Sequence, residues 1–579
     1  MLATGLLGDR MRGALLAEYR GLKKDGVLGP ILRKGEFEEK PLGTRIVTRI
    51  KGNGYARLAD IPLASFRARL CARGDQSVAG QHHDPDHTAA MVARPESLRF
   101  ICAMAVDENL HAHATADVQR AFRTPLIDKR VIIRLPRTFD PDGDGLRPID
   151  SEPLYSLLRK GLEGLRQGSR LFYDEFKDAL ADAGLFPTKS DPCVFTNYKP
   201  VAPPVKPNSC PESIFFKGAE RVAARNEFAG KVVALLHVDD LLVVAATETL
   251  KNALLASLAK KYSLKVSPLT TFLGLDFKVC FSLKGRSIFI SQPEMARTIL
   301  QRAGMADATS SPTPLLPGTV IDVPREAREE VSAVDKKRYR SVVMALNWLA
   351  CMTKPTLKYP VGKLSRYISD PAQEHILALK QVLRYLAGTI MKGIRFSWSP
   401  EKGDADSSAA YSDSSHVDDK ITSKSTLAYV IFRARGPISW YSKLSALVPR
   451  SPQQSEFLAL DALLLELVWL TELQKECGYT GPSQRNPDLE ADCLLTVHLD
   501  SAGALSCLND VIRHQANKHY RLRIESAKEL IKLYGFILRK IAGALNPANL
   551  FTKMLSGVQA EREYSRVECD AQPGGHAEK

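Results

Sequence analysis

The sequence predicts a globular chain of several domains that contains both β-prone apolar runs and amphipathic helices. Its 579 residues correspond to about three to five domains at roughly 100–200 residues each. Hydrophobic residues make up 44% and charged residues 25%, as in ordinary globular proteins. This composition excludes a chain disordered throughout, a collagen-like chain and a disulfide-packed miniprotein.

Charge is the first functional signal. Lys and Arg number 80 and Asp and Glu 65, which leaves a net charge of +15 and a pI of about 9.2. Such a surplus favours a polyanionic partner, most simply nucleic acid, although a solvated basic surface is the alternative. The ten cysteines form no Cys-x-x-Cys pair, so we expect no structural zinc site and a reducing compartment.

Two observations bear on location. Asp9, Arg10 and Arg12 interrupt the apolar runs of the first twenty residues, so no signal peptide is predicted. The longest apolar stretch, 232–246, is too short for a bilayer and holds two aspartates. We therefore expect a soluble, intracellular protein with no membrane partner, in a cytoplasmic particle, the nucleus or both.

Several segments are predicted to be irregular, and one to be a basic β-rich region. The alternation of apolar and basic residues over 41–80 favours strands. Poor periodicity predicts a lead-in at 1–40, and proline content predicts a surface loop at 199–213 and a linker at 307–331. Polar composition predicts a domain boundary at 401–409 and a tail at 557–579.

Two helices carry clear start signals. Asp370 followed by Pro371 predicts a capped helix that Gly388 can end. Ser451-Pro-Gln-Gln454 is a Ser-x-x-Gln capping box, and leucines at helical spacing follow it. Both helices indicate folding rather than chemistry.

The most informative segment is an apolar run interrupted by His237-Val-Asp239-Asp240. Its pattern predicts a buried hairpin with two adjacent carboxylates at or near the tip. Asp is also a common turn residue, which is the structural alternative. Adjacent carboxylates in a dry setting repel each other, however, and a divalent cation relieves that cost. Chemistry at phosphorus uses two such cations held by carboxylates from separate segments, and Asp117 is the candidate partner.

A second acid pattern begins after residue 405. Asp413 ends a short strand candidate, Glu456 lies early in the capped helix, and Asp500 ends another apolar strand candidate before a predicted helix. Acids at strand ends and on one helix can converge on a metal pair. Taken singly, each is more often a cap or a turn residue.

An ordered set of motifs resembles a known family. The set includes Asp117-Val-Gln-Arg-Ala-Phe122 and Val238-Asp239-Asp240, and its other members lie at 66–74, 164–173, 190–195, 272–274, 339–343, 364–367 and 383–388. In this order they resemble the reverse transcriptases of copia-type LTR retrotransposons, from about residue 41 to about residue 556.

This resemblance implies an α+β fold: a right-hand polymerase with fingers, palm and thumb, then a connection, then an α/β ribonuclease H-like domain. The implied boundaries are a lead-in at 1–40, fingers and palm at 41–276, thumb and connection at 277–400, a ribonuclease H-like domain at 405–556 and a tail at 557–579. The implied partners are an RNA template, a DNA primer, dNTPs and an RNA–DNA hybrid, whereas the oligomeric state stays open.

By the same resemblance, Asp117, Asp239 and Asp240 hold two Mg²⁺ ions, with Mn²⁺ as a possible substitute. Phe122 matches the bulky residue that excludes a ribose 2′-hydroxyl, Gln167 matches a glutamine near nucleotide and template, and Arg67 and Arg69 match basic residues that face the triphosphate. Core packing, a solvated loop and a solvated strand are the respective alternatives. Residues 272–274 match a region that grips the primer, although a plain hairpin has the same pattern.

The later motifs resemble the ribonuclease H domain of this family. Asp413, Glu456 and Asp500 would hold metal ions for hydrolysis of the RNA strand in a hybrid, and Lys518-His519 matches a further family position. Asn549 stands where the family normally has Asp, and an amide is a poorer Mg²⁺ ligand than a carboxylate. His237 replaces the usual Tyr before Val-Asp-Asp, near the implied primer end.

Three hypotheses follow. The leading one is an RNA-directed DNA polymerase with a linked hybrid-cleaving domain. The main rival is a catalytically inactive, basic nucleic-acid-binding remnant, which Asn549 and the irregular N-terminus favour. A host protein that reuses the fold as a scaffold is a third. We find no zinc knuckle, protease or integrase motif, so the chain resembles the 3′ end of a larger polyprotein or a degraded copy.

Overall fold

The structure is a computed structural model, and it describes residues 6–50, 66–143, 145–148, 150–198, 230–398, 408–479, 495–508 and 520–571. Three of the predicted features therefore lie wholly or largely outside the described residues: the proline-rich loop at 199–213, the boundary at 401–409 and the pair Lys518-His519. Among the described helices, none is long and apolar enough to cross a membrane.

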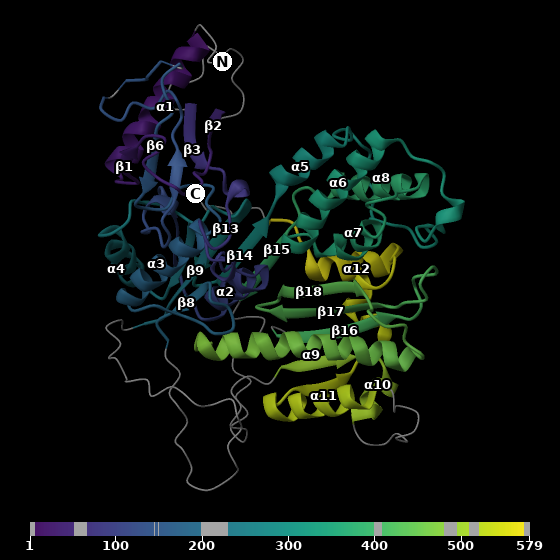
Figure 1. The fold of residues 1–579 in the computed structure, drawn as a ribbon. Helices are drawn as coiled ribbons and strands as arrows, with labels where there is room; N and C mark the ends of the chain where they lie inside the picture. The colour runs from purple at the N-terminus through teal and green to yellow at the C-terminus, as the bar shows by residue number, and fades with distance from the viewer. Residues whose placement is uncertain are drawn as a thin grey trace, which may run out of the picture.

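The N-terminal part is built from one helix and two small sheets (Figure 1). Its elements are α1 (Leu6–Lys24), the antiparallel pair β2 (Thr44–Ile50) and β3 (Phe66–Ala72), and a three-stranded sheet of β1 (Leu28–Leu32), β6 (Tyr155–Leu158) and β5 (Ile132–Arg134). The pair β2–β3 confirms the basic β-rich prediction for 41–80.

The irregular lead-in predicted for residues 1–40 is wrong. Helix α1 buries Leu15, Tyr19 and Leu22, which lie on one face at helical spacing, against β3. Glu18 on the same helix accepts a hydrogen bond from the backbone N–H of Leu70 at 2.7 Å. Packing of this apolar face therefore orders a segment that composition alone suggests is loose.

A six-stranded sheet forms the centre of the next region. Its order is β11-β4-β10-β9-β8-β7, and the ladders between neighbours are antiparallel. The strands are β4 (Ala112–Val118), β7 (Phe186–Pro187), β8 (Val194–Thr196), β9 (Val232–His237), β10 (Asp240–Ala245) and β11 (Leu264–Ser267). The helices of this region are α2 (Pro95–Asp107), α3 (Gly168–Asp182) and α4 (Glu248–Ala259).

A second sheet crosses the boundary predicted at 276/277. Its order is β12-β13-β14-β15, and its strands are β12 (Thr271–Phe272), β13 (Leu275–Ser282), β14 (Gly285–Ser291) and β15 (Ile394–Trp398). The predicted boundary falls inside β13. The same sheet also joins residues on both sides of the helical region, because β14 pairs with β15, about a hundred residues later. Leu273 and Gly274, both at positive φ, make the tight turn between β12 and β13.

Helices α5 (Pro293–Arg302), α6 (Ala333–Met352), α7 (Lys358–Ser365) and α8 (Gln373–Gly388) form a separate helical core. The predicted linker 307–331 is irregular, as expected, but it is not a free linker. Leu315 and Ile321 are buried in this core, and the backbone carbonyl of Ile321 lies 2.7 Å from His375 Nε2. The segment is part of the helical core.

Helix α8 begins later than Asp370 and Pro371 predict. The carboxylate of Asp370 lies 2.9 Å from Lys336 Nζ and therefore does not cap the helix. Instead, His375 Nδ1 accepts a hydrogen bond at 2.7 Å from the backbone N–H of Ala372, and the last helical residue is Gly388, as predicted.

The C-terminal region contains a five-stranded mixed sheet in the order β18-β17-β16-β19-β20. Three of its strands, β16, β19 and β20, run parallel, and β17 and β18 continue antiparallel from β16. The elements are β16 (Ala409–Ser415), β17 (Thr426–Arg433), β18 (Gly436–Leu444), α9 (Pro452–Glu476), β19 (Thr496–Leu499), α10 (Ala502–Leu508), α11 (Arg521–Tyr534) and β20 (Ile537–Lys540). Ser451 accepts from the backbone N–H of Gln454 at 3.2 Å, so the predicted cap of α9 is confirmed.

The tail predicted for 557–579 is wrong for its described part. Residues Gly557–Val567 form helix α12, and Cys569 forms a backbone bridge with Gly393. Glu568 accepts from the backbone N–H of Thr356 at 2.9 Å and lies 3.5 Å from the buried ammonium of Lys354. The segment is ordered because its carboxylate offsets a charge that burial would otherwise disfavour.

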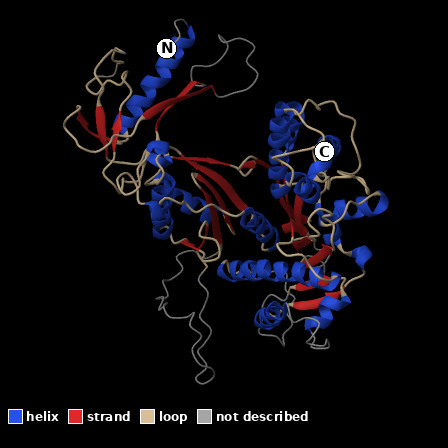
Figure 2. Ribbon diagram, turned by 45° about the vertical axis from the view of Figure 1, so that its right-hand side comes forward, coloured by secondary structure: helices blue, strands red, loops and turns tan. Residues whose placement is uncertain are grey.

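The regions join through a shared interior (Figures 1 and 2). Arg99 on α2 is 2% exposed, and its guanidinium donates to the carbonyls of Ile438 in β18 at 2.6 Å and of Cys351 in α6 at 2.8 Å. The same group stacks over Trp440 at 4.0 Å. One side chain thus ties the first sheet's helix to the helical core and to the C-terminal sheet.

Candidate metal centres

The predicted acidic hairpin is confirmed. Strands β9 and β10 pair antiparallel with Val238 and Asp239 between them, and Val238 takes a φ of 59° that a β-branched residue rarely adopts. In the sheet register Asp240 lies opposite both His237 on β9 and Asp117 on β4. Acids more than a hundred residues apart in the chain therefore lie at neighbouring positions of one sheet.

These acids share a desolvated, negative setting. Burial, followed by repulsion from Asp239 and Asp117, raises the pKa of Asp240 to about 6. Burial and the neighbouring Asp117 also raise the pKa of Asp239. Carboxylate oxygens are the ligands that Mg²⁺ prefers. The three acids share one end of the sheet, but their oxygens do not all lie within 4.8 Å of one another.

The hairpin also positions His237. Its Nδ1 is buried and has no hydrogen-bond partner among the residues that the structure describes, and burial lowers the pKa of the imidazole. A neutral ring therefore borders the acids at the position where the sequence departs from the family pattern.

The two predicted arginines lie on the exposed side of β3, because its buried positions are Phe66, Ala68 and Leu70. Arg69 lowers the pKa of Asp239 through its charge, which brings β3 into electrostatic range of the acids. Arg67 lies opposite Arg49 in the β2–β3 ladder, and its charge is not among those that shift the pKa of Asp239 or Asp240.

Neither Phe122 nor Gln167 lies on open surface. Phe122 is half-buried, in the 3₁₀ turn Ala121–Arg123, with its ring edge-on to Phe172 at 6.5 Å. Gln167 is 1% exposed and donates from Nε2 to the carbonyl of His82 at 2.8 Å, so the solvated-loop alternative is excluded. Its amide holds the 77–83 loop against the start of α3.

The glycines of the same motif bring separate segments together. Gly164 has a φ of +90°, and a Cβ there would lie 2.3 Å from the carbonyl oxygen of Ala72. Nearby, the guanidinium of Arg123, which the sequence analysis did not single out, lies 3.0 Å from Glu163 and 2.6 Å from Glu18. Helix α1 and the motif segments are therefore joined by a buried ion cluster.

The second acid set is more compact. Asp413, Glu456 and Asp500 each offer an oxygen within 4.8 Å of the others, and no other group of three possible ligands in the described residues meets that distance. Asp413 lies on β16, Glu456 on α9 and Asp500 directly after β19. Parallel strands β16 and β19, with the capped helix packed on them, bring the three together.

Hydrogen-bond donors surround these acids. Ser414 donates to Glu456 Oε1 from its hydroxyl at 2.9 Å, and the Thr552 hydroxyl donates to Asp413. Burial and repulsion from Asp413 and Asp500 raise the pKa of Glu456 to about 8. Burial also raises the pKa of Asp413, although Lys553 and Thr552 oppose that shift. Three converging carboxylates fit a divalent cation.

Asn549 lies beside this set, on the 3₁₀ segment Pro547–Phe551. It is buried, and its Oδ1 accepts from Lys553 Nζ at 2.5 Å. Lys553 also lies 3.3 Å from Asp413 Oδ2. Sequence reasoning used this segment only for the Asn549 departure and missed Thr552 and Lys553, although both stand in the same motif.

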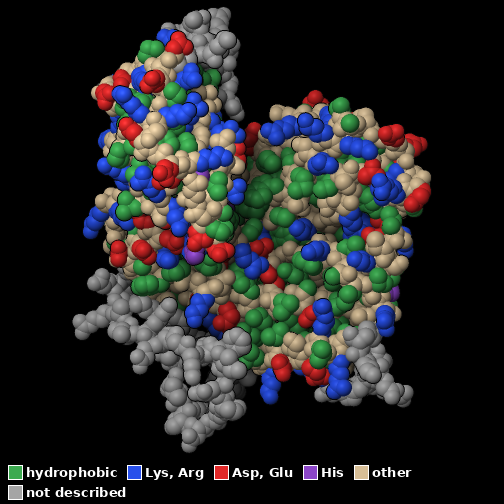
Figure 3. Space-filling view, viewed as in Figure 1, with side chains coloured by type: hydrophobic (Ala, Val, Ile, Leu, Met, Phe, Trp, Pro, Cys, Tyr) green, Lys and Arg blue, Asp and Glu red, His purple; other side chains and the backbone are tan. Residues whose placement is uncertain are grey.

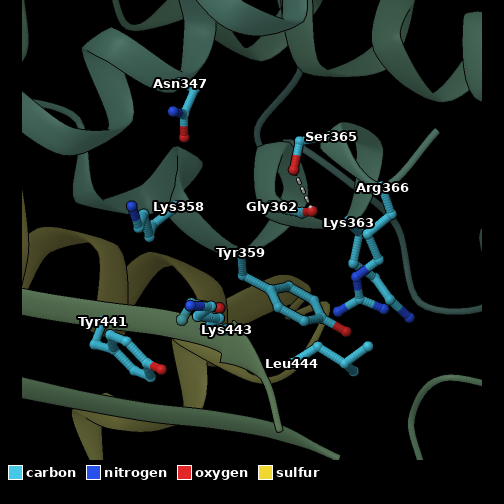
Figure 4. A pocket seen from close by; sticks show the side chains of 11 residues that line it. Asn347, Lys358, Tyr359, Gly362, Lys363, Ser365, Arg366, Tyr441, Lys443 and Leu444 are labelled. Atoms are coloured by element: carbon cyan, nitrogen blue, oxygen red, sulfur yellow. Dashed lines mark hydrogen bonds between the residues drawn. The ribbon is translucent and has the colours of Figure 1, made fainter. Parts of the chain in front are cut away.

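A basic groove separates the helical core from the C-terminal sheet. A cavity of about 300 Å³ lies between α7 and β18 (Figure 4). Lys363 and Arg366 in its wall are paired with carboxylates, whereas within the described residues no carboxylate partner is recorded for Lys358 or Lys443. The hollow between the two upper lobes in Figure 3 is a different place from this cavity, and Lys and Arg side chains lie along its rim.

Comparisons with known proteins agree with this arrangement. A family model for reverse transcriptase (RNA-dependent DNA polymerase) matches residues 34–201. A retrovirus-related Pol polyprotein from transposon TNT 1-94 of Nicotiana tabacum is 27% identical over 561 residues, covering 94% of this chain and 37% of that protein. The polyprotein from transposon RE1 of Arabidopsis thaliana is 27% identical over 88% of this chain and 31% of its own length.

A shorter relative is matched almost throughout. The uncharacterized mitochondrial protein AtMg00810 of Arabidopsis thaliana is 33% identical over 239 residues, which cover 41% of this chain and 92% of that protein. The chain spans about a third of the length of the two Pol polyproteins. It belongs to the reverse transcriptase family of copia-type retrotransposon Pol polyproteins, and its α+β fold is a reverse transcriptase fold.

Proposed function

We propose that this chain is an RNA-directed DNA polymerase that extends a DNA primer on an RNA template, using dNTPs. The observation that carries the proposal is the sheet register that sets Asp117 opposite Asp240, with Asp239 at the adjoining turn. Burial and the neighbouring carboxylates raise the pKa of Asp239 and of Asp240, and such a negative setting at a sheet end is suited to binding hard divalent cations.

Asp117, Asp239 and Asp240 would hold Mg²⁺ or Mn²⁺. Such ions lower the pKa of a primer 3′-hydroxyl and offset the charge that develops on the triphosphate. Arg69 is within electrostatic range of Asp239, so its guanidinium is placed to attract a triphosphate entering the same space. Arg67 points to the same side of β3 and would extend this basic strand.

Phe122 and Gln167 would shape the nucleotide site. A half-buried ring held by Phe172 offers a stiff wall against a ribose 2′-hydroxyl. Gln167 would act indirectly, because its amide is bonded to the His82 carbonyl and so fixes the loop beside it. Replacement of Phe122 by Ala should therefore raise ribonucleotide incorporation relative to deoxynucleotide incorporation.

The polymerase proposal is tested by incorporation of dTTP on oligo(dT)-primed poly(rA) with Mg²⁺ or Mn²⁺. Asp239→Ala should abolish incorporation. Asp178→Asn, which removes an exposed carboxylate from α3, is the matched control and should leave it unchanged. Incorporation that survives Asp239→Ala would refute the assignment.

We further propose that residues 408–571 act as a ribonuclease H-like unit on RNA–DNA hybrids. Asp413, Glu456 and Asp500 would hold the metal ions, and water would be the nucleophile. The support is their mutual approach within 4.8 Å on elements from three parts of this region. Cleavage of a labelled hybrid should be lost in Asp413→Ala, and cleavage that persists in that variant would exclude this site.

A catalytically inactive nucleic-acid-binding remnant is the second candidate, and Asn549 is the observation that favours it. A folded chain that binds hybrid but shows neither incorporation nor cleavage would establish that alternative. Location in a cytoplasmic particle or the nucleus belongs to either candidate.

Both candidates predict binding to hybrid through phosphate contacts. Lys358 and Lys443 line the groove between α7 and β18 and are candidates for such contacts. Affinity should fall steeply between low and moderate salt, because phosphate contacts release counterions. Unchanged affinity over that range would count against the basic surface as the contact.

A further inference from the structure

A lysine ammonium takes part in the second acid site. Lys553 Nζ lies 3.3 Å from Asp413 Oδ2 and donates to Asn549 Oδ1 at 2.5 Å. The amide nitrogen of Asn549 donates to the carbonyl of Gly543 at 2.6 Å. Both polar atoms of Asn549 are therefore engaged, and its oxygen faces a cation that belongs to the protein.

Lys553 reaches the acids from the protein surface. Its side chain is 43% exposed, so the ammonium keeps contact with water while it reaches a buried carboxylate. Asp413 also accepts from the Thr552 hydroxyl, one residue before Lys553. The short segment after Asn549 thus supplies two donors to the most buried acid of the set.

Formal charge indicates what the site can hold. When ionised, the three carboxylates and the ammonium carry a net charge of −2. One divalent cation neutralises that charge, whereas two would leave an excess of +2 close to Lys553. A carboxylate at 549 would supply an additional anionic ligand, but an amide does not.

We propose that the Lys553 ammonium, shared by Asp413 and Asn549, takes the place of a second divalent cation, so that this site binds one Mg²⁺ or Mn²⁺ ion. The inference rests on the proposed ribonuclease H-like function of the same acids. It assigns Lys553 as a positioning residue whose charge, together with the missing carboxylate at 549, excludes a second ion, and it makes Asn549 a specific substitution rather than a general sign of decay.

The test counts Mn²⁺ bound to the full chain, from the electron paramagnetic resonance signal of the free ion. Asp239→Asn and Asp240→Asn are present throughout, to remove ions at the first acid site. The parent of this series should bind one ion. Asn549→Asp should bind two, because the new carboxylate both ligates a cation and competes for Lys553.

Asn252→Asp is the matched control, since it makes the same change at an exposed position on α4. It should leave the count at one. Asn549 is buried, so Asn549→Asp is also checked for folding by thermal melting with and without Mn²⁺, and Mn²⁺ should raise its midpoint more than the parent's. Lys553→Met provides a second route that leaves Asn549 intact.

Lys553→Met should still bind one ion, about tenfold more tightly, because a nearby positive charge has been removed. Two ions in the parent, or one in a folded Asn549→Asp, would overturn the inference. Affinity unchanged in Lys553→Met would do the same. Failure of the proposed function itself is distinguishable: the count in the parent would then not fall on adding Asp413→Asn.

Discussion

The two acid clusters reach similar chemistry from different surroundings. Asp117, Asp239 and Asp240 lie on neighbouring strands of one sheet and its hairpin turn, and the charge recorded as offsetting Asp239 most is that of Arg69. The second cluster draws on two strands, a helix and a 3₁₀ segment, which supply donors from Ser414, Thr552 and Lys553. The negative charge of the first cluster therefore has to be neutralised mainly by cations from solution, while the protein itself neutralises part of the charge of the second.

The largest expected effect tests whether the clusters work independently. Asp240→Asn should lower dNTP incorporation at least about a hundredfold, as expected for removal of a group that stabilises transition-state charge, and should leave hybrid cleavage intact. Asp500→Asn should do the opposite. Parallel assays of both reactions on both variants decide the point. Loss of both activities in either variant would break the comparison.

A second prediction concerns the internal donors. Thr552→Val should lower the free energy of unfolding by about 1–2 kcal/mol, because buried Asp413 loses a hydrogen bond. Urea unfolding in the presence of EDTA measures it. Thr249→Val, at an exposed position on α4, is the control and should change little. Equal losses in the two variants would mean that the hydroxyl does not support the acid.

A third prediction follows from the raised pKa of Glu456. A folded-state pKa raised to about 8 favours folding at low pH, so this contribution to stability is lost as pH rises from about 5 to 9. In EDTA, Glu456→Gln should be more stable than the parent at pH 9 by about 1 kcal/mol and less dependent on pH. Thermal melting at pH 5, 7 and 9 measures the difference, and parallel curves would contradict it.

The smallest effect concerns Arg69. Its charge lowers the pKa of Asp239, so Arg69→Gln should raise that pKa and move the acid limb of the incorporation profile to higher pH. A shift of a few tenths of a pH unit is expected for an exposed charge. Arg69→Lys keeps the charge and should restore the profile. An identical shift in Arg69→Lys would point to shape rather than charge.

Local signals explain what the sequence predicts correctly. The hairpin at 232–245 and the start of α9 at Ser451 depend on apolar patterning and a cap, which neighbouring residues determine. The convergence of Asp413, Glu456 and Asp500 follows from strand ends beside a helix, so it could also be anticipated. Resemblance to a family added the order of the polymerase and ribonuclease H-like regions along the chain.

The errors involve partners far away in the chain. Asp370 does not cap its helix because Lys336 attracts its carboxylate, and nothing near Asp370 indicates that contact. The ordered C-terminal segment depends on Glu568 meeting Lys354, more than two hundred residues earlier. Helix α1 could have been predicted from the sequence, since Leu15, Tyr19 and Leu22 share one face. Glycines and basic residues around them obscured the pattern.

The buried guanidinium of Arg99 has a consequence for how the two proposed activities relate. Because it bonds to Ile438 and Cys351 at once, the region that would synthesise DNA and the region that would cut RNA cannot hinge freely about α2. On a hybrid bound to both regions, the fold would then set the distance between the primer 3′ end and the position at which the RNA strand is cleaved.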